Sequence, residues 1–234
     1  MKPMIFESHA HYDSRKFDED REELLNSMQE NGVGTIINAG ATWKSVTTGL
    51  ELANQYPFVY AALGLHPDEV GDLNEERFEI LKAECQKEKV VAVGEIGLDY
   101  YWDNEAHDVQ KKWFIRQLEL ARELDLPVIV HSRDAAEDTV TLMKEIHAEE
   151  IPGVIHCYSY SKELAREYIK MGFHIGVGGV VTFNNGKKLK EFVNKEYSTA
   201  YYDCDGVLLQ VTPLKEGLRR EYTPLKEIPR SVKK

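Results

Sequence analysis

Residues 4–11 read Met-Ile-Phe-Glu-Ser-His-Ala-His, a short apolar run that leads into two histidines. On an extended strand, side chains two positions apart point to the same side, so His9 and His11 face one region. Two imidazoles at one strand end can hold a metal ion. An isolated His-x-His pair is more often an ordinary polar strand end, so the rest of the chain has to decide between these interpretations.

Further metal-ligating side chains close short apolar runs later in the chain. They are Glu95, His131, His156 and Asp205. Each of them alone has a simpler explanation, because polar residues are common where strands end. Asp203 also competes with Asp205 for the same role. The recurrence of the pattern, rather than any single residue, favours a shared metal site.

Apolar runs of strand length alternate with amphipathic stretches of helical length about eight times. Strands are expected near residues 4–6, 35–38, 58–63, 90–93, 127–130, 153–155, 173–177 and 200–202. Helices are expected near residues 18–31, 46–53, 78–85, 105–124, 140–146, 164–171 and 189–193. This alternation predicts parallel strands joined by right-handed crossovers. A doubly wound open sheet and a closed barrel both fit it.

The positions of the candidate ligands favour the barrel. They follow the first, fourth, fifth, sixth and eighth expected strands, and closure of a barrel brings the carboxyl ends of distant strands together. An open sheet would separate the first strand from the last. We therefore expect an α/β fold, a single (β/α)8 TIM barrel over residues 1–234 that lacks a full last helix.

Composition predicts a soluble protein of the cytoplasm. Hydrophobic residues make up 42% of the 234 residues, which is enough for a sizeable core. No apolar run approaches the roughly 20 residues that span a bilayer, and Glu7 comes too early for a signal peptide. Three cysteines without CxxC spacing are typical of reduced thiols. We expect no membrane partner, and a monomer is consistent with the sequence.

The net charge of −11 argues against a simple basic groove for nucleic acid. Binding of phosphates usually depends on an excess of lysine and arginine. Bound divalent cations would supply local positive charge that the total does not count. The acidic composition therefore excludes tight nonspecific duplex binding but not a metal-dependent phosphodiesterase.

The donor set suits borderline divalent metals. Imidazole and carboxylate together favour Zn, Mn, Co or Ni, and the carboxylates also tolerate Mg. Four histidines and two carboxylates exceed the needs of one tetrahedral ion, so a second ion with a bridging carboxylate is the economical use of the surplus. Two ions about 3.5–4 Å apart can clamp the attacking and leaving oxygens of a phosphoryl displacement.

Six segments in this order resemble the TatD family of metal-dependent deoxyribonucleases, which belongs to the amidohydrolase-like barrels. They are Ser8-His9-Ala10-His11-Tyr12-Asp13, Gly64-Leu65-His66-Pro67, Val93-Gly94-Glu95-Ile96-Gly97-Leu98-Asp99, Val130-His131-Ser132-Arg133-Asp134, His156-Cys157-Tyr158-Ser159 and Asp203-Cys204-Asp205. The Gly-Glu-Ile-Gly-Leu-Asp run is the most specific, and the combination is stronger than any one segment.

The resemblance implies a binuclear metal centre. His9 and His11 would hold one ion, and His131 and His156 would hold the second. Glu95 would bridge the two ions.

The resemblance also implies roles for three residues around the ions. Asp205 would ligate the first ion and act as the base toward the attacking water. His66 and Arg133 would contact the substrate phosphate, for which the planar guanidinium of arginine is well suited.

The sequence therefore predicts a metal-dependent hydrolase that cleaves phosphodiester bonds in DNA, as an exonuclease. One alternative is a hydrolase of another ester, amide or phosphate bond on the same barrel. Another is a catalytically degenerate metal-binding scaffold, suggested by Glu7 where the family usually has Asp and by Gly206-Val207 after the last ligand. The tyrosines Tyr100, Tyr158 and Tyr160 could stack bases, but packing explains them more simply.

Overall fold

Seven parallel strands form one continuous sheet in the order of the sequence. The computed structural model describes residues 5–102, 104–178, 197–202 and 208–213. The strands are β1 (Ile5–Ala10), β2 (Val33–Ala39), β3 (Val59–Leu63), β4 (Val90–Asp99), β5 (Val128–Arg133), β6 (Gly153–Ile155) and β7 (His174–Ile175). Every neighbouring pair is parallel. The first seven expected strands are thus confirmed in their predicted order.

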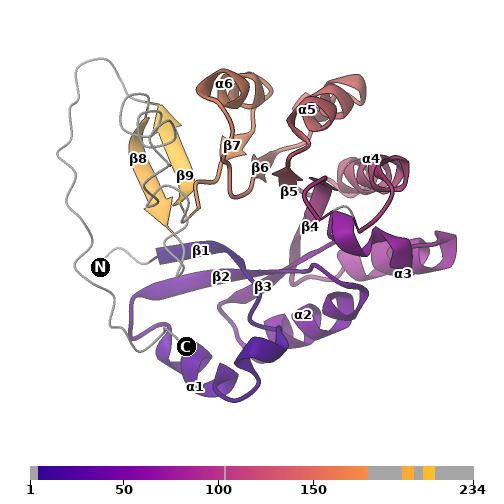
Figure 1. Cartoon of the computed structure of the whole chain (residues 1–234). Helices are drawn as coiled ribbons and strands as arrows, with labels where there is room; N and C mark the ends of the chain where they lie inside the picture. The colour runs from indigo at the N-terminus through magenta and orange to yellow at the C-terminus, as the bar shows by residue number, and fades with distance from the viewer. Residues whose placement is uncertain (1–4, 103, 179–196, 203–207, 214–234) are drawn as a thin grey trace.

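A helix connects each strand of the sheet to the next. The helices are α1 (Arg21–Ser27), α2 (Trp43–Gln55), α3 (Glu75–Cys85), α4 (His107–Glu123), α5 (Ala136–Glu145) and α6 (Lys162–Lys170), with short 3-10 turns η1 (Arg15–Phe17), η2 (Pro67–Asp72) and η3 (Ala148–Glu150). The sheet curls around a centre and the helices lie along its outer side (Figure 1). This is the expected α/β architecture of the TIM-barrel type. Across the described ranges, every helix is too short or too polar to cross a bilayer.

The eighth expected strand pairs differently from the prediction. Residues 200–202 fall in β8 (Tyr197–Tyr202), which pairs antiparallel with β9 (Leu208–Pro213) in a separate two-stranded sheet. This hairpin lies beside β1 and β7, the outer strands of the main sheet (Figure 1). A strand partner a few residues away in sequence costs less closure entropy than one at the far end of the chain. The expected helix near residues 189–193, the last-helix region and Asp205 lie outside the described residues.

The two faces of the sheet carry different hydrophobic clusters. One cluster packs strand residues such as Leu63 and Val93 against Leu50 of α2, Leu81 of α3 and Phe114 of α4. Successive side chains of a strand point to opposite faces, so the second cluster lies on the face away from the helices. It consists of Ala39, Ala62, Ala92 and Ile129. Small side chains on this inner face let the strands curl closely together.

Gly97 permits the close approach of β4 and β5. It pairs with His131 and has a φ of +146°, a conformation that side chains rarely adopt. A methyl group at this position would lie 1.9 Å from the carbonyl oxygen of His131. The glycine therefore lets β5 bring His131 directly beside the inner face of β4.

Candidate metal centre

Five of the predicted ligands meet at the carboxyl ends of four strands. His9 lies in β1, and His11 follows that strand directly. Glu95 lies in β4 and His131 in β5, while His156 is the residue after β6. The curl of the sheet is what brings these residues together, since they span almost 150 positions of the sequence.

The buried carboxylate of Glu95 stands at the middle of this cluster. Its Oε2 atom lies 3.3 Å from Nε2 of His9 and 3.6 Å from Nε2 of His11. Its Oε1 atom lies 3.0 Å from Nδ1 of His131 and 3.9 Å from Nε2 of His156. Each carboxylate oxygen thus faces a different pair of histidines, and only 5% of the side chain is exposed.

The tautomer of His11 is set by a backbone carbonyl. Its Nδ1–H donates to the carbonyl oxygen of Ala39 at 2.8 Å, so its Nε2 keeps a lone pair. That Nε2 lies 3.0 Å from Nε2 of His9. His9 Nδ1 is buried and has no hydrogen-bond partner among the described residues. An unpartnered ring nitrogen such as Nδ1 in a buried ring is unusual for a purely structural histidine.

The spacing of these donor atoms fits a metal ion. The nitrogens of His9 and His11 and the nearer oxygen of Glu95 are 3.0–3.6 Å apart. Ligands on a tetrahedral ion with bonds of about 2.1 Å are separated by about 3.4 Å. The three atoms therefore have the spacing of ligands to one ion.

His9 and His156 lie face to face. Their rings are 3.6 Å apart with an interplanar angle of 15°. Burial lowers the pKa of His9, and burial and the charge of His9 hold the pKa of His156 well below its usual range. Two stacked cations would repel one another, so both rings are neutral and keep a lone pair for a metal.

His131 is held between two carboxylates. Nδ1 faces Glu95, and Nε2 lies 3.0 Å from Oδ2 of Asp99. Burial lowers the pKa of His131, but the hydrogen bonds to Asp99 and Glu95 outweigh it and raise the pKa to about 9. Burial also raises the pKa of Glu95, yet the surrounding histidines, with hydrogen bonds from His131 and His9, leave it well below its usual value. Glu95 is therefore an anion in the absence of metal.

Asp99 is a site residue that the sequence reasoning did not assign. Residues 95, 97 and 99 alternate along β4, so their positions on one face of the strand were a signal that could have found it. A carboxylate that accepts the far N–H of a metal-binding histidine fixes the orientation of the ring and raises its basicity. Asp99 is 1% exposed and has this position relative to His131.

The two predicted phosphate-contacting residues differ in how they relate to His131: His66 contacts its ring, and Arg133 lies two residues later in β5. The ring centroid of His66 is 4.3 Å from that of His131. Nδ1 of His66 accepts from the backbone N–H of Asp68 at 3.3 Å, which places the ring proton on Nε2. Burial lowers the pKa of His66 to about 4, so the ring is neutral. Arg133 ends β5, and its guanidinium lies over the ring of Tyr101.

The mutual distances of the ligand atoms give a different grouping of the possible metal ligands. One ligand atom each of His9, Glu95 and His156 lie within 4.8 Å of one another. One ligand atom each of His66, Asp99 and His131 do the same. The distances to the two oxygens of Glu95 instead separate His9 and His11 from His131 and His156. The division by the two oxygens of Glu95 rests on direct atom contacts of the carboxylate at the centre of the cluster.

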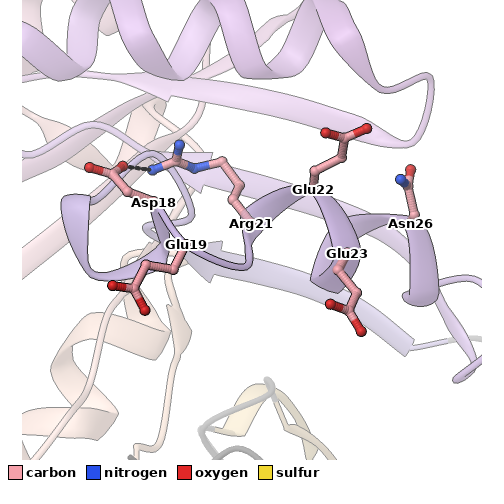
Figure 2. A pocket seen from close by; sticks show the side chains of 6 residues that line it. All are labelled: Asp18, Glu19, Arg21, Glu22, Glu23 and Asn26. Atoms are coloured by element: carbon pink, nitrogen blue, oxygen red, sulfur yellow. Dashed lines mark hydrogen bonds and ion pairs between the residues drawn. The ribbon is translucent and has the colours of Figure 1, made fainter.

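A hollow beside α1 is not part of this centre. It is lined by Asp18, Glu19, Arg21, Glu22, Glu23 and Asn26 (Figure 2). Arg21 binds Asp18 at 2.7 Å across it. It contains no histidine and shares no residue with the cluster around Glu95, so it does not compete as the functional site.

The curled parallel sheet and the histidine–carboxylate cluster at its strand ends define the class: a metal-dependent hydrolase with a TIM-barrel-type fold. A family model described as TatD related DNase matches residues 6–201. The chain belongs to the TatD family.

Related sequences and a solved structure agree with this placement. YabD of Bacillus subtilis, an uncharacterized metal-dependent hydrolase, is 44% identical over 192 residues, which are 82% of this chain and 75% of YabD. The crystal structure of YjjV, a TatD homolog from Escherichia coli, has a TM-score of 0.77 and 34% identity, covering 83% of this chain and 76% of YjjV. The 3'-5' ssDNA/RNA exonuclease TatD of Escherichia fergusonii is 29% identical over 191 residues, 81% of this chain and 73% of that protein.

Proposed function

We propose that this protein hydrolyses phosphodiester bonds at the end of a DNA strand, using two divalent metal ions. One observation carries the proposal: the two oxygens of Glu95 face two different pairs of histidines at 3.0–3.9 Å. A carboxylate that joins two ions is a recurring part of two-metal sites for phosphoryl displacement. A TatD relative that is named a 3'-5' ssDNA/RNA exonuclease supports the choice of substrate.

In this proposal each pair of histidines serves one ion. His9 and His11 would hold the first ion, and His131 and His156 would hold the second. Glu95 would be the ligand that the two ions share. Imidazole and carboxylate donors admit Mg, Mn, Zn, Co or Ni.

We assign the whole of residues 1–234 to one barrel domain, and the sparse cysteines of the sequence suggest the cytoplasm.

When bound, the ions supply Lewis acidity and lower the pKa of water. The chain's own residues do the rest. Asp205 takes a proton from the attacking water on a carboxylate oxygen. Asp99 keeps the ring of His131 in one orientation through its Nε2–H. His66 offers the N–H of Nε2 to a phosphate oxygen, and Arg133 offers its positively charged guanidinium to the same phosphate.

Chelation of the metal tests the proposal. We expect the purified protein to shorten single-stranded DNA with Mn or Mg, to lose this activity in excess EDTA, and to regain it when metal is returned. Equal degradation of DNA with and without EDTA would contradict the mechanism. RNA, duplex DNA, a carboxylic ester and a phosphotriester, assayed in parallel, would show whether another bond is cleaved faster.

A further inference from the structure

Two large aromatic side chains are exposed beside the metal centre. Tyr101 is 53% and Trp102 is 58% exposed, the highest values for large hydrophobic side chains in the described part of the chain. Both lie in the loop after β4, the strand that carries Glu95, and Tyr100 separates them from its end. Their ring centroids are 4.9 Å apart at an interplanar angle of 87°. Exposure of this much aromatic surface costs free energy in water, so a partner that covers it is a reasonable expectation.

A cation lies over these rings. The Cζ atom of Arg133 is 3.7 Å from the ring centroid of Tyr101 and 5.5 Å from that of Trp102. We call Tyr101, Trp102 and Arg133 the aromatic shelf. The shelf combines flat π surfaces with a positive charge, on a chain whose net charge is −11. Proteins that bind single-stranded nucleic acid use the same two components, one for bases and the other for phosphates.

A single carboxylate ties the shelf to the metal centre. Oδ1 of Asp99 accepts the backbone N–H of Tyr101 at 2.9 Å and that of Trp102 at 3.2 Å. Oδ2 of the same carboxylate faces Nε2 of His131. The backbone of the shelf is therefore fixed relative to a predicted metal ligand, as a substrate platform needs to be.

The simpler interpretation is that the rings merely pack under Arg133 at the rim. Such packing accounts for one covered face of Tyr101. It does not account for the large exposure of both rings, or for their position one carboxylate away from the metal centre. A phosphodiester at the centre would have its neighbouring base within the reach of this rim.

We propose that the aromatic shelf stacks an unpaired base at the end of a nucleic acid strand, while Arg133 binds a phosphate of the same strand. This inference rests on the proposed function, and it specifies a single-stranded end as the substrate. In a duplex the faces of the bases are covered by their neighbours, so only a frayed or single-stranded end can offer a base to the shelf. The contact is not specific for sequence, because every base has a flat face.

The catalytic test compares strands with and without bases. The substrates are one single-stranded oligonucleotide and the same strand with abasic residues at its last three positions at each end. The measured quantity is the ratio of kcat/KM for the base-bearing strand to that for the abasic strand. We expect Trp102→Ala to lower this ratio about tenfold, because stacking on an aromatic side chain is worth roughly that factor or more per base. An unaltered ratio would overturn the proposal.

A matched control removes an aromatic ring elsewhere. Tyr56 lies before β3, at the opposite end of the strands, and its ring contacts Phe58. Tyr56→Ala should keep the wild-type ratio. If it lowers the ratio as much as Trp102→Ala does, the effect is one of general stability and the shelf is not its cause.

Binding without turnover separates this inference from the proposed function. In EDTA, the fluorescence of Trp102 should be quenched by the base-bearing strand and much less by the abasic strand, and Trp102→Phe should remove the difference. Equal quenching by the two strands overturns the shelf, whatever the enzyme hydrolyses. A wild-type protein that shows the difference in quenching but cleaves no strand with any metal contradicts the proposed function and leaves the shelf supported.

Discussion

Glu95 and Asp99 lie four residues apart on the same strand, but their surroundings differ. Glu95 has four histidines around it and faces two of them with each oxygen. Asp99 accepts from the backbone of Tyr101 and Trp102 and from one histidine, His131. Both carboxylates are buried, and a buried anion requires compensation.

The difference shows two ways to compensate a buried carboxylate. The protein's own N–H groups compensate Asp99, so its role is to hold the structure around it. Around Glu95, burial keeps His9 and His156 neutral, so each of these two rings retains a lone pair that can bind a cation. Glu95, the inner carboxylate, is therefore suited to binding cations from solution. Asp99, the outer carboxylate, is suited to holding the residues around Glu95 in place.

Removal of the inner carboxylate should have the largest effect. Glu95→Gln keeps the size of the side chain but removes the charge that a pair of ions would share. We expect kcat/KM for single-stranded DNA to fall by about a thousandfold or more with Mn. The matched control is Glu119→Gln, since Glu119 is exposed on α4. If the activity of Glu95→Gln is within tenfold of the wild type, Glu95 is not an essential ligand of the metal ions.

The glycine between the two carboxylates should matter for stability. Gly97→Ala would place a methyl group against the carbonyl of His131 and force an unfavourable φ. We expect a loss of about 4 kcal/mol in the free energy of unfolding, measured with urea. Gly32 is the control: it also has a positive φ, but its surroundings are open, so Gly32→Ala should cost only about 1 kcal/mol. Equal costs would show that strand proximity at Gly97 is unimportant.

Protonation of His131 should make the metal-free protein pH-dependent. Its folded pKa is raised to about 9 from 6.5, so its stabilisation is complete below about pH 6.5 and is lost as the pH rises through 9. The pKa values of His9 and His156 are lowered, so these two residues change the stability with pH only below pH 6.5. In EDTA, the wild type should lose about 3 kcal/mol more than His131→Gln between pH 6.5 and 9. If the free energy of unfolding depends on pH in the same way for the two proteins, His131 is not stabilised in its charged form by Glu95 and Asp99.

Neutralisation of the outer carboxylate should have a smaller effect on metal binding. Asp99→Asn keeps an oxygen that can accept from His131 but removes its charge. Changes of this kind typically weaken metal binding 10- to 100-fold. Calorimetric titration of the EDTA-stripped protein with Zn or Mn would measure the Kd. An unchanged Kd would mean that Asp99 holds only the aromatic shelf and does not act through His131.

The sequence predicted the strands of the main sheet better than their closure. Strands buried on both faces are apolar runs, and β3, β4 and β5 are the clearest of these. The partner of residues 200–202 is a matter of tertiary competition, and the prediction of a parallel eighth strand was wrong because β9 offers a close antiparallel partner.

The ligand set was proposed from strand ends, but its internal geometry was not. Which oxygen of Glu95 faces which histidine depends on side-chain torsions that no sequence pattern reports. Asp99 is the last residue of the Gly-Glu-Ile-Gly-Leu-Asp motif, and its alternation with Glu95 along the strand places both on one face, which is the signal for its role. Tyr158, considered for base stacking, is 2% exposed, while the exposed Tyr101 and Trp102 were not singled out. Exposure at a strand end is set by the path of the following loop, and that path is not readable from composition.

The most direct test of the account is anomalous diffraction from crystals of the protein grown with Mn or Zn. The account predicts two ions, one bonded to each carboxylate oxygen of Glu95, with His9 and His11 on the first and His131 and His156 on the second. Crystals in which no ion lies within bonding distance of Glu95, with metal present at saturating concentration, would contradict it.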